Sequence, residues 1–260
     1  MLKWILILVF FTQVYSAAQA QVTNYRLYDK NSGIQAATAE SVQLSRFVPF
    51  NGRPSICFTL SKTDKTVENG KRAEVFFKAE KTLPVERWYA FNIWLPASFV
   101  YDSLPEIVAQ WHGTPDFDLG ENYRSPAVDL MIQKGEWHLE TRWASQPVND
   151  NNSLTGSFTG KSSIPFGKTI TEKWTQWIFH IKFSYNNDGL LEVWKDGAKI
   201  YSRKGPNYYN DKLGPYFKFG IYKWEWMKPQ NTKVNKRTLY FGDVKLGDNK
   251  ATINDFLGDK

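Results

Sequence analysis

The chain has 260 residues and a formal charge of +7, and 16% of its residues are aromatic, including 11 tryptophans. Its single cysteine, Cys57, excludes an intrachain disulfide, and beyond the N-terminus no apolar run approaches the ~20 residues of a membrane span, so no membrane insertion is expected. The positive charge favours a polyanionic partner, which could be a nucleic acid, an anionic surface or an acidic polysaccharide.

The N-terminus has the pattern of an export signal. Lys3 is followed by an apolar run over residues 4–14 and then by an Ala-x-Ala site that ends at Ala20. We expect residues 1–20 to be a signal peptide, and the mature protein to be periplasmic or secreted. Export and the aromatic content together favour carbohydrate over nucleic acid as the partner. Residues 21–260 contain no linker rich in Pro, Ser or Gly, which predicts a single domain, and we expect a monomer.

Short apolar runs separated by turn residues predict strands through most of the chain. The segment Arg72–Lys78 alternates, which places Arg72, Glu74 and Phe76 on one face of a strand. The Arg–Glu pair is either a surface ion pair that contributes little to stability or a buried pair that holds the arginine side chain in one pose. The nearly continuous apolar run Trp88–Pro96 is typical of a central strand that is covered on both faces.

Glu106–Gly113 predicts a further strand, and this one has a polar face. Alternation places Val108, Gln110 and His112 on one side, with Ile107 opposite. A strand that points Gln and His the same way is uncommon for a purely structural element. A single histidine, however, is more often a structural polar residue than a catalyst.

Two polar segments predict long loops. Thr114–Ser125 is acidic and could cover a cleft or hold a cation. Its acidic residues lack the EF-hand spacing, so a structural Ca²⁺ ion is an alternative without a motif to support it. The segment Gln146–Ser163 is rich in Asn, Ser, Thr and Gly and predicts an exposed loop.

Turn signals also predict hairpins. Residues 127–132 and 136–143 form one around Lys134-Gly135, which projects His138, Glu140 and Arg142 to one side. A meander with Asp-Gly turns follows over residues 177–201. Its histidine, His180, is interpreted as structural.

The stretch Tyr216–Trp226 is not explained as plain core. As a single strand it would assign a cation, a glycine, a phenol and two indoles to one face, namely Lys218, Gly220, Tyr222, Trp224 and Trp226. Aromatic rings stack on pyranoses, glycine lets a ligand approach the backbone, and the lysine favours an acidic glycan. The alternative is a half-exposed edge strand rich in aromatic residues.

The many short strands and regular turns predict an all-β fold, a sandwich of antiparallel sheets of the jelly-roll kind. Three segments, Arg72–Glu74, Gln110–Gly113 and Phe217–Trp224, resemble the heparin lyase I-like and glucuronan lyase-like polysaccharide lyases, in the same order and over most of the chain. The resemblance implies a concanavalin-like β-jelly roll with the substrate across its concave sheet. The chain is too short for the second lobe of heparin lyases and is closer in length to glucuronan lyases.

The resemblance also implies site residues. The expected catalytic residues are His112, Tyr222, Lys218, Arg72 and Gln110. The expected substrate-binding residues are Glu74, Lys223, Trp224, Trp226, Arg142 and His138. For the near-N-terminal glutamine that heparin lyases use, Gln35 and Gln43 are both candidates.

Such a lyase cleaves the bond to O4 of a uronic acid by removing the C5 proton, and it leaves a 4,5-unsaturated uronide. It needs a clamp for the carboxylate, a base near C5 and an acid near O4, and no cofactor is required. Arg72 and Gln110 suit the clamp, with Lys218 as a further candidate. His112 and Tyr222 suit the proton transfers in either order, and a nearby Arg72 or Lys218 is expected to lower the pKa of Tyr222.

Two other functions are compatible with parts of the pattern. A non-catalytic jelly-roll module that binds acidic glycans would explain the tryptophans and the charge, but not His112, Lys218 and Tyr222 together. A glycoside hydrolase would need two carboxyl groups beside the scissile bond, and no strand carries the Glu-x-Asp-x-x-Glu motif of jelly-roll glucanases.

Overall fold

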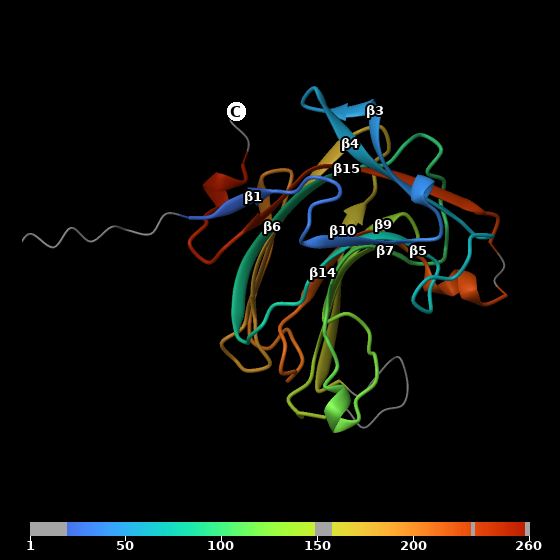
Figure 1. Cartoon of the computed structure of the whole chain (residues 1–260). Helices are drawn as coiled ribbons and strands as arrows, with labels where there is room; N and C mark the ends of the chain where they lie inside the picture. The colour runs from blue at the N-terminus through green and yellow to red at the C-terminus, as the bar shows by residue number, and fades with distance from the viewer. Residues whose placement is uncertain (1–19, 149–157, 230–231, 258–260) are drawn as a thin grey trace, which may run out of the picture.

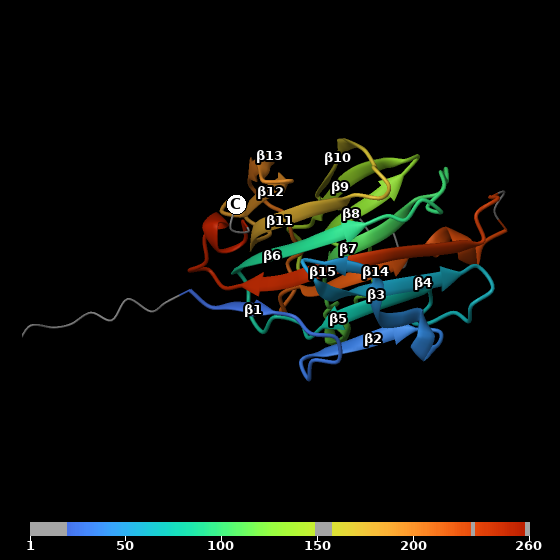
Figure 2. The ribbon, with the colours of Figure 1, turned by 90° about the horizontal axis from the view of Figure 1, so that it is seen from above.

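The computed structural model describes residues 20–148, 158–229 and 232–257, whose regular structure consists of strands and short 3-10 helices. The expected signal peptide lies outside these residues except for Ala20. Two antiparallel sheets lie face to face (Figure 1), which confirms the predicted all-β jelly-roll sandwich. Seen from above, their strands run in similar directions (Figure 2), as in aligned β-sandwiches.

The first sheet has the order β13 (Ala198–Lys204), β12 (Leu190–Lys195), β11 (Trp174–Phe183), β6 (Val85–Trp94), β15 (Lys236–Gly247), β4 (Arg53–Ser61), β3 (Val42–Phe50), with β1 (Val22–Asn24) also paired to β15. The second has the order β10 (Gly160–Lys168), β9 (Glu136–Trp143), β8 (Val128–Gln133), β7 (Glu106–His112), β14 (Tyr216–Tyr222), β5 (Arg72–Phe77), β2 (Ser32–Ala36). The 3-10 helices are η1 (Ala39–Ser41), η2 (Phe117–Leu119), η3 (Trp224–Met227) and η4 (Ile253–Asp255). None of the helices in the described part of the chain is long and apolar enough to cross a membrane.

The core between the sheets is largely aromatic. Phe217 and Phe219 of β14 point into it, and the ring of Phe219 lies 4.9 Å from that of Phe241 on β15. Trp111 of β7 contacts Phe179 of β11 at a ring distance of 4.7 Å. Aromatic pairs of this kind contribute about 0.5–1.5 kcal/mol beyond the burial of their area. Because side chains alternate along a strand, the core leaves the opposite face of β7 and β14 to polar residues.

The hairpin between β8 and β9 forms at the predicted turn. Lys134 and Gly135 both have positive φ, 52° and 74°, as a two-residue type I′ turn requires. The predicted loop Gln146–Ser163 is wrong at its C-terminal end, because residues from Gly160 onward form β10 and pair with β9. β10 is an edge strand whose residues alternate between exposed and half-buried positions, because solvent covers one of its faces.

Candidate active site

A groove of about 410 Å³ opens on the face of the second sheet that is turned away from the core. Seven of the residues expected at the site line it: Arg72, Gln110, His112, Arg142, Lys218, Tyr222 and Trp224. Most come from the adjacent strands β5, β14 and β7, so residues far apart in the sequence meet across three neighbouring strands. The structure therefore brings together the three segments that the sequence singled out.

Glu74 lies beneath the groove, with 1% of its surface exposed. Its carboxylate accepts hydrogen bonds from Arg72 at 3.2 Å and from Gln110, and it forms an ion pair with Lys218 at 2.9 Å. Burial raises the pKa of Glu74, but Lys218 and then Arg72 oppose this effect and hold it below its ordinary value. Burial lowers the pKa of Lys218, and the charge of Glu74 opposes this effect. With Arg72 and Lys218 both protonated, two cations share one anion and the cluster carries one net positive charge at the groove.

Arg72 is held in one pose by several contacts. Its guanidinium lies 4.2 Å from the ring centre of Tyr222 and donates to the backbone carbonyl of Glu68 at 3.1 Å. A further donation, 3.4 Å long, goes to Oε1 of Gln35 on β2. Of the two glutamine candidates, Gln35 lines the groove, whereas Gln43 is exposed on the first sheet.

A β-bulge sets the spacing of the groove residues on β7 and β14. Lys218 pairs with Gln110 and Tyr222 with Ile107, so that two residues, Gly220 and Ile221, face the single residue Val108. Gly220 has a φ of 137°, and a Cβ there would lie 2.3 Å from the carbonyl oxygen of Ala73, so only glycine fits.

A second irregularity, between β7 and β8, corrects the predicted face of β7. Simple alternation placed Val108 beside Gln110 and His112, with Ile107 opposite. In the structure Val108 is in the core and Ile107 lines the groove. Ile107 pairs with Met131 and Ala109 with Leu130, so β7 has one residue more than β8 at this point. This extra residue reverses the alternation on its N-terminal side and leaves Gln110 and His112 where they were expected.

His112 is at the C-terminal end of β7, and its ring is stacked on Tyr216 at 5.1 Å. Its Nδ1 lies 2.8 Å from the carbonyl oxygen of Gly113. A carbonyl only accepts hydrogen bonds, so Nδ1 carries the proton and Nε2 keeps a free lone pair. Burial lowers the pKa of His112 to about 4, and the nearby charges of Lys218 and Arg72 act in the same direction.

Tyr222 remains a protonated phenol at neutral pH. Burial raises its pKa, and the opposing effect of Arg72 is smaller. The expectation that Arg72 or Lys218 brings this pKa below the ordinary value is therefore wrong, because desolvation of the phenolate outweighs the nearby positive charge. A Cβ on Gly70 would lie 2.5 Å from the Tyr222 ring, so the loop before β5 packs closely against it.

The expected common face of residues 216–226 is wrong beyond Tyr222, where β14 ends and η3 begins. Trp224 still lines the groove, with its ring 5.8 Å from that of Tyr222. Trp226 is instead packed in the core. Lys223 is fully buried, and its Nζ lies 2.9 Å from Asp102. The structure thus places Lys223 and Trp226 away from the groove.

The other expected substrate-binding residues also differ in position. Glu74 supports the groove from below and is not among the residues that line it. Arg142 lines the groove while its guanidinium donates to Asp129 at 2.7 Å. His138 pairs with Met131, which lines the groove, but does not itself line it.

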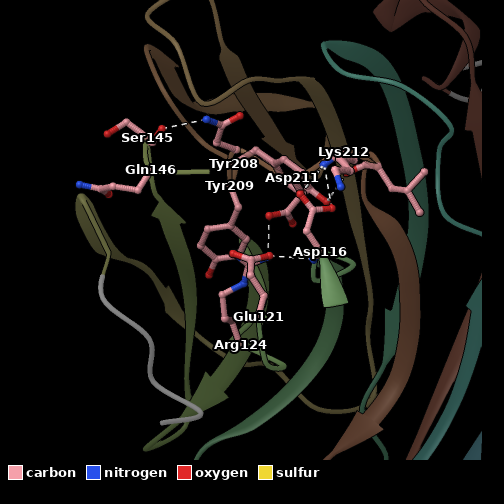
Figure 3. A network of polar contacts seen from close by, with 12 residues as sticks. Asp116, Glu121, Arg124, Ser145, Gln146, Tyr208, Tyr209, Asp211 and Lys212 are labelled. Carbon is pink, nitrogen blue, oxygen red and sulfur yellow. Dashed lines mark hydrogen bonds and ion pairs between the residues drawn. The ribbon is translucent and has the colours of Figure 1, made fainter. Parts of the chain in front are cut away.

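The acidic loop between β7 and β8 is an ion-paired structure. Arg124 donates to Glu121 at 2.9 Å and to Asp211 at 2.6 Å, and Lys212 pairs with Asp118 at 2.5 Å (Figure 3 shows the buried part of this network). Throughout the described residues, no three His, Cys, Asp or Glu side chains are arranged to hold a metal ion. Of the acidic residues that suggested a cation site, Asp118 and Glu121 have basic side chains as partners, and Asp116 accepts from the backbone N–H of Lys212.

Two groove residues, Tyr216 and Tyr123, were missed in the sequence. Tyr216 was treated as the start of an aromatic strand, although alternation from Lys218 places it on the groove face, where it pairs with His112. Tyr123 lies in the acidic loop, where no periodicity indicates direction. Its ring is 6.4 Å from that of His112.

Comparison with known proteins agrees with this architecture. The structure is similar to an endo-β-1,4-glucuronan lyase from the fungus Trichoderma reesei, with a TM-score of 0.72, 17% identity, and coverage of 89% of this chain and 96% of that one. It is also similar to alginate lyase vAL-1 from a Chlorella virus (TM-score 0.55, 12% identity, coverage 84% and 92%).

A third similar structure is a binding domain of botulinum neurotoxin DC, with a TM-score of 0.50, 13% identity, and coverage of 91% of this chain and 44% of that one. Among curated protein sequences, none matches the chain. A sequence model described as polysaccharide lyase matches residues 22–245. That match spans both sheets and the groove, and the chain therefore belongs to the polysaccharide lyase family.

Proposed function

We propose that this lyase cleaves a uronic-acid-containing polysaccharide at the bond to O4 by β-elimination. The observation that carries the proposal is the buried cluster of Arg72, Lys218 and Glu74, whose net positive charge lies under a groove that also holds a neutral imidazole and a protonated phenol. A uronate carboxylate supplies the missing negative charge. The imidazole and the phenol are of the kinds that take and give a proton.

The carboxylate of the reacting uronate would bind above Arg72 and Lys218, next to the amide of Gln110. Binding there neutralises the carboxylate, so the negative charge that develops when the C5 proton leaves is stabilised and this proton becomes more acidic. Glu74 holds all three side chains in place through its own contacts, so the clamp needs no rearrangement when substrate binds.

We assign the base to His112 and the acid to Tyr222. The free lone pair on Nε2 of His112 takes the C5 proton, the C5–H electrons form the C4–C5 double bond, and the C4–O4 bond breaks. The departing O4 takes the phenolic proton of Tyr222. The directions of the two pKa shifts support this order, because they make His112 neutral and Tyr222 protonated before the reaction.

The pairing of groove cations favours an unsulfated uronan of the glucuronan type over heparin. Arg72 and Lys218 share Glu74, Arg142 has Asp129, and Arg124 has Asp211. The one excess positive charge of the Arg72–Lys218–Glu74 cluster suits one carboxylate at the reacting unit, whereas a sulfated chain would need further cations. A structural neighbour that acts on glucuronan, by its description, supports the same choice.

The second candidate function is a non-catalytic module that binds acidic glycans, since the same fold occurs in a neurotoxin binding domain. For either function we propose export through the segment 1–20, a monomer, and no nucleic-acid partner.

The test is to incubate the purified mature protein with glucuronan, heparin, heparan sulfate, alginate and pectate, and to follow the ultraviolet absorbance of the conjugated product. We expect a rise with glucuronan and none with heparin. Binding to a polyuronate without any rise in absorbance would favour the binding module. A saturated reducing end would indicate a hydrolase.

A further inference from the structure

The loop between β7 and β8 has an inverted pattern of burial. Phe117 and Tyr123 leave 55% and 53% of their surfaces exposed, whereas the charged residues Asp116, Glu121 and Arg124 are buried. Apolar rings normally take the buried positions in a loop and charged groups the exposed ones. The rings of Phe117 and Tyr123 meet edge to face at 5.3 Å, so the two exposed side chains form one surface.

Buried polar contacts hold the loop in this conformation. Glu121 accepts from the backbone N–H of Asp116 at 2.8 Å and from Arg124 at 2.9 Å. Arg124 also reaches Asp211 and lies 4.4 Å over the ring of Tyr209, in the segment before β14 (Figure 3). Glu121 and Asp211 share the cation Arg124, and Asp116 accepts from the backbone N–H of Lys212. These buried contacts keep the loop ordered while its aromatic residues remain outside.

The exposed pair is continuous with the groove. The ring of Tyr216 stacks on His112 at 5.1 Å, that of Tyr123 lies 6.4 Å from His112, and Phe117 follows at 5.3 Å from Tyr123. Tyr123 itself lines the groove. A row of rings thus leads from the imidazole to the surface of the loop.

We infer that Phe117, which Tyr123 supports edge to face, forms a stacking platform for a sugar ring of the same polysaccharide, outside the unit that reacts at His112. The inference rests on the proposed function, because it takes the groove as the place where the polymer lies. Flat aromatic faces suit the apolar face of a pyranose, and the platform carries no charge that would select a substituent. It contributes affinity for long chains rather than chemistry.

The test compares Phe117→Ala with the wild-type protein on glucuronan and on a series of its oligosaccharides. We expect the KM for the polymer to rise about tenfold, with kcat unchanged, and the KM for the shortest cleavable oligosaccharide to stay the same. Phe117→Trp should restore the affinity. Phe47→Ala is the control, because Phe47 is 96% exposed on β3 of the first sheet and should have no effect.

Affinity electrophoresis in gels containing glucuronan measures polymer binding independently of turnover. Unchanged mobility and KM for Phe117→Ala would overturn the platform, as would equal losses on short and long substrates. A wild-type protein that binds the polymer without forming a double bond would overturn the lyase proposal alone, and the mobility of Phe117→Ala would then still decide the platform.

Discussion

The guanidinium of Arg72 lies 4.2 Å from the centre of the Tyr222 ring, and both side chains line the groove. One residue therefore serves the proposed clamp and also orients the proposed acid. The planar guanidinium allows this, because it stacks through its face while its edge donates to Glu74 and to the carbonyl of Glu68.

Arg72→Lys should reduce kcat/KM for glucuronan by roughly 100-fold, since an ammonium group cannot stack and bind in the plane at the same time. Because this substitution leaves the charge of the cluster unchanged, a loss of kcat/KM would show that the planar geometry of the guanidinium is required. Arg53→Lys, at an exposed pair with Asp243 on the first sheet, should leave kcat/KM unaltered. A lysine variant as active as the wild type would remove Arg72 from the clamp.

Tyr222→Phe should abolish formation of the unsaturated product while binding of glucuronan persists. The substitution removes one hydroxyl and leaves the ring under Arg72, so the loss of turnover would reflect the missing proton donor. Product absorbance and affinity electrophoresis measure the two properties, and Tyr28→Phe at an exposed position is the matched control. Near-normal product formation by Tyr222→Phe would contradict the assignment of the acid.

The depressed pKa of His112 predicts a pH dependence of stability. The folded-state pKa is about 4 against 6.5 in the unfolded chain, so between these pH values the unfolded chain binds the extra proton. The free energy of unfolding should therefore fall as the pH falls through this window, by up to about 3 kcal/mol, and His112→Gln should remove that part of the slope. Urea unfolding at pH 7 and pH 4.5 measures it.

The same shift predicts that kcat/KM keeps its neutral-pH value down to about pH 5, because His112 stays unprotonated in the free enzyme. An acid limb centred near pH 6.5 would mean that the imidazole has its ordinary pKa and that neither burial nor the charges of Lys218 and Arg72 depress it.

Lys223→Met should lower stability without a specific effect on substrate binding. It leaves Asp102 and Glu106, both buried, with Arg237 as their remaining cation, and loss of one partner from a buried ion pair costs about 3–5 kcal/mol. Trp224→Ala, one residue further on, should instead raise KM with little change in stability. Urea denaturation and steady-state kinetics on both variants would show whether Lys223 serves stability and Trp224 serves substrate binding.

Chelation should leave the activity within about twofold of its starting value. The clamp, the base and the acid are all assigned to side chains, so the chemistry as proposed uses no metal. Activity on glucuronan is measured before and after dialysis against EDTA. A loss that Ca²⁺ restores would show that the acidic loop or another part of the chain binds a cation.

Much of the groove follows from sequence periodicity. The alternation in Gln110–His112 and the hairpin at Lys134-Gly135 are local properties, and both were predicted correctly. The resemblance to polysaccharide lyases added the expectation that three segments more than 30 residues apart form one site. No local pattern contains that information. The alternatives left open for Arg72 and Glu74 could not be resolved locally, since a buried pair and a surface pair have the same spacing.

The failures have a common physical cause. The bulge at Val108 and the end of β14 after Tyr222 depend on pairing with neighbouring strands, so alternation cannot detect them. Lys223 looked like a ligand-binding cation because its anionic partners, Asp102 and Glu106, come from a distant segment. Burial also outweighed charge at Tyr222, and the degree of burial is known only once the fold is known.

Gly220 links the two sides of the second sheet. A Cβ at this position would lie 2.8 Å from the ring of Phe58, which belongs to the opposite sheet, so the bulge that separates Lys218 from Tyr222 is fitted against the hydrophobic interior. Selection for catalysis therefore extends through the sheet to a phenylalanine that no substrate can touch. Phe58 should tolerate fewer replacements than its distance from the groove suggests, and engineering of this enzyme has to treat the interior packing and the reaction geometry as one problem.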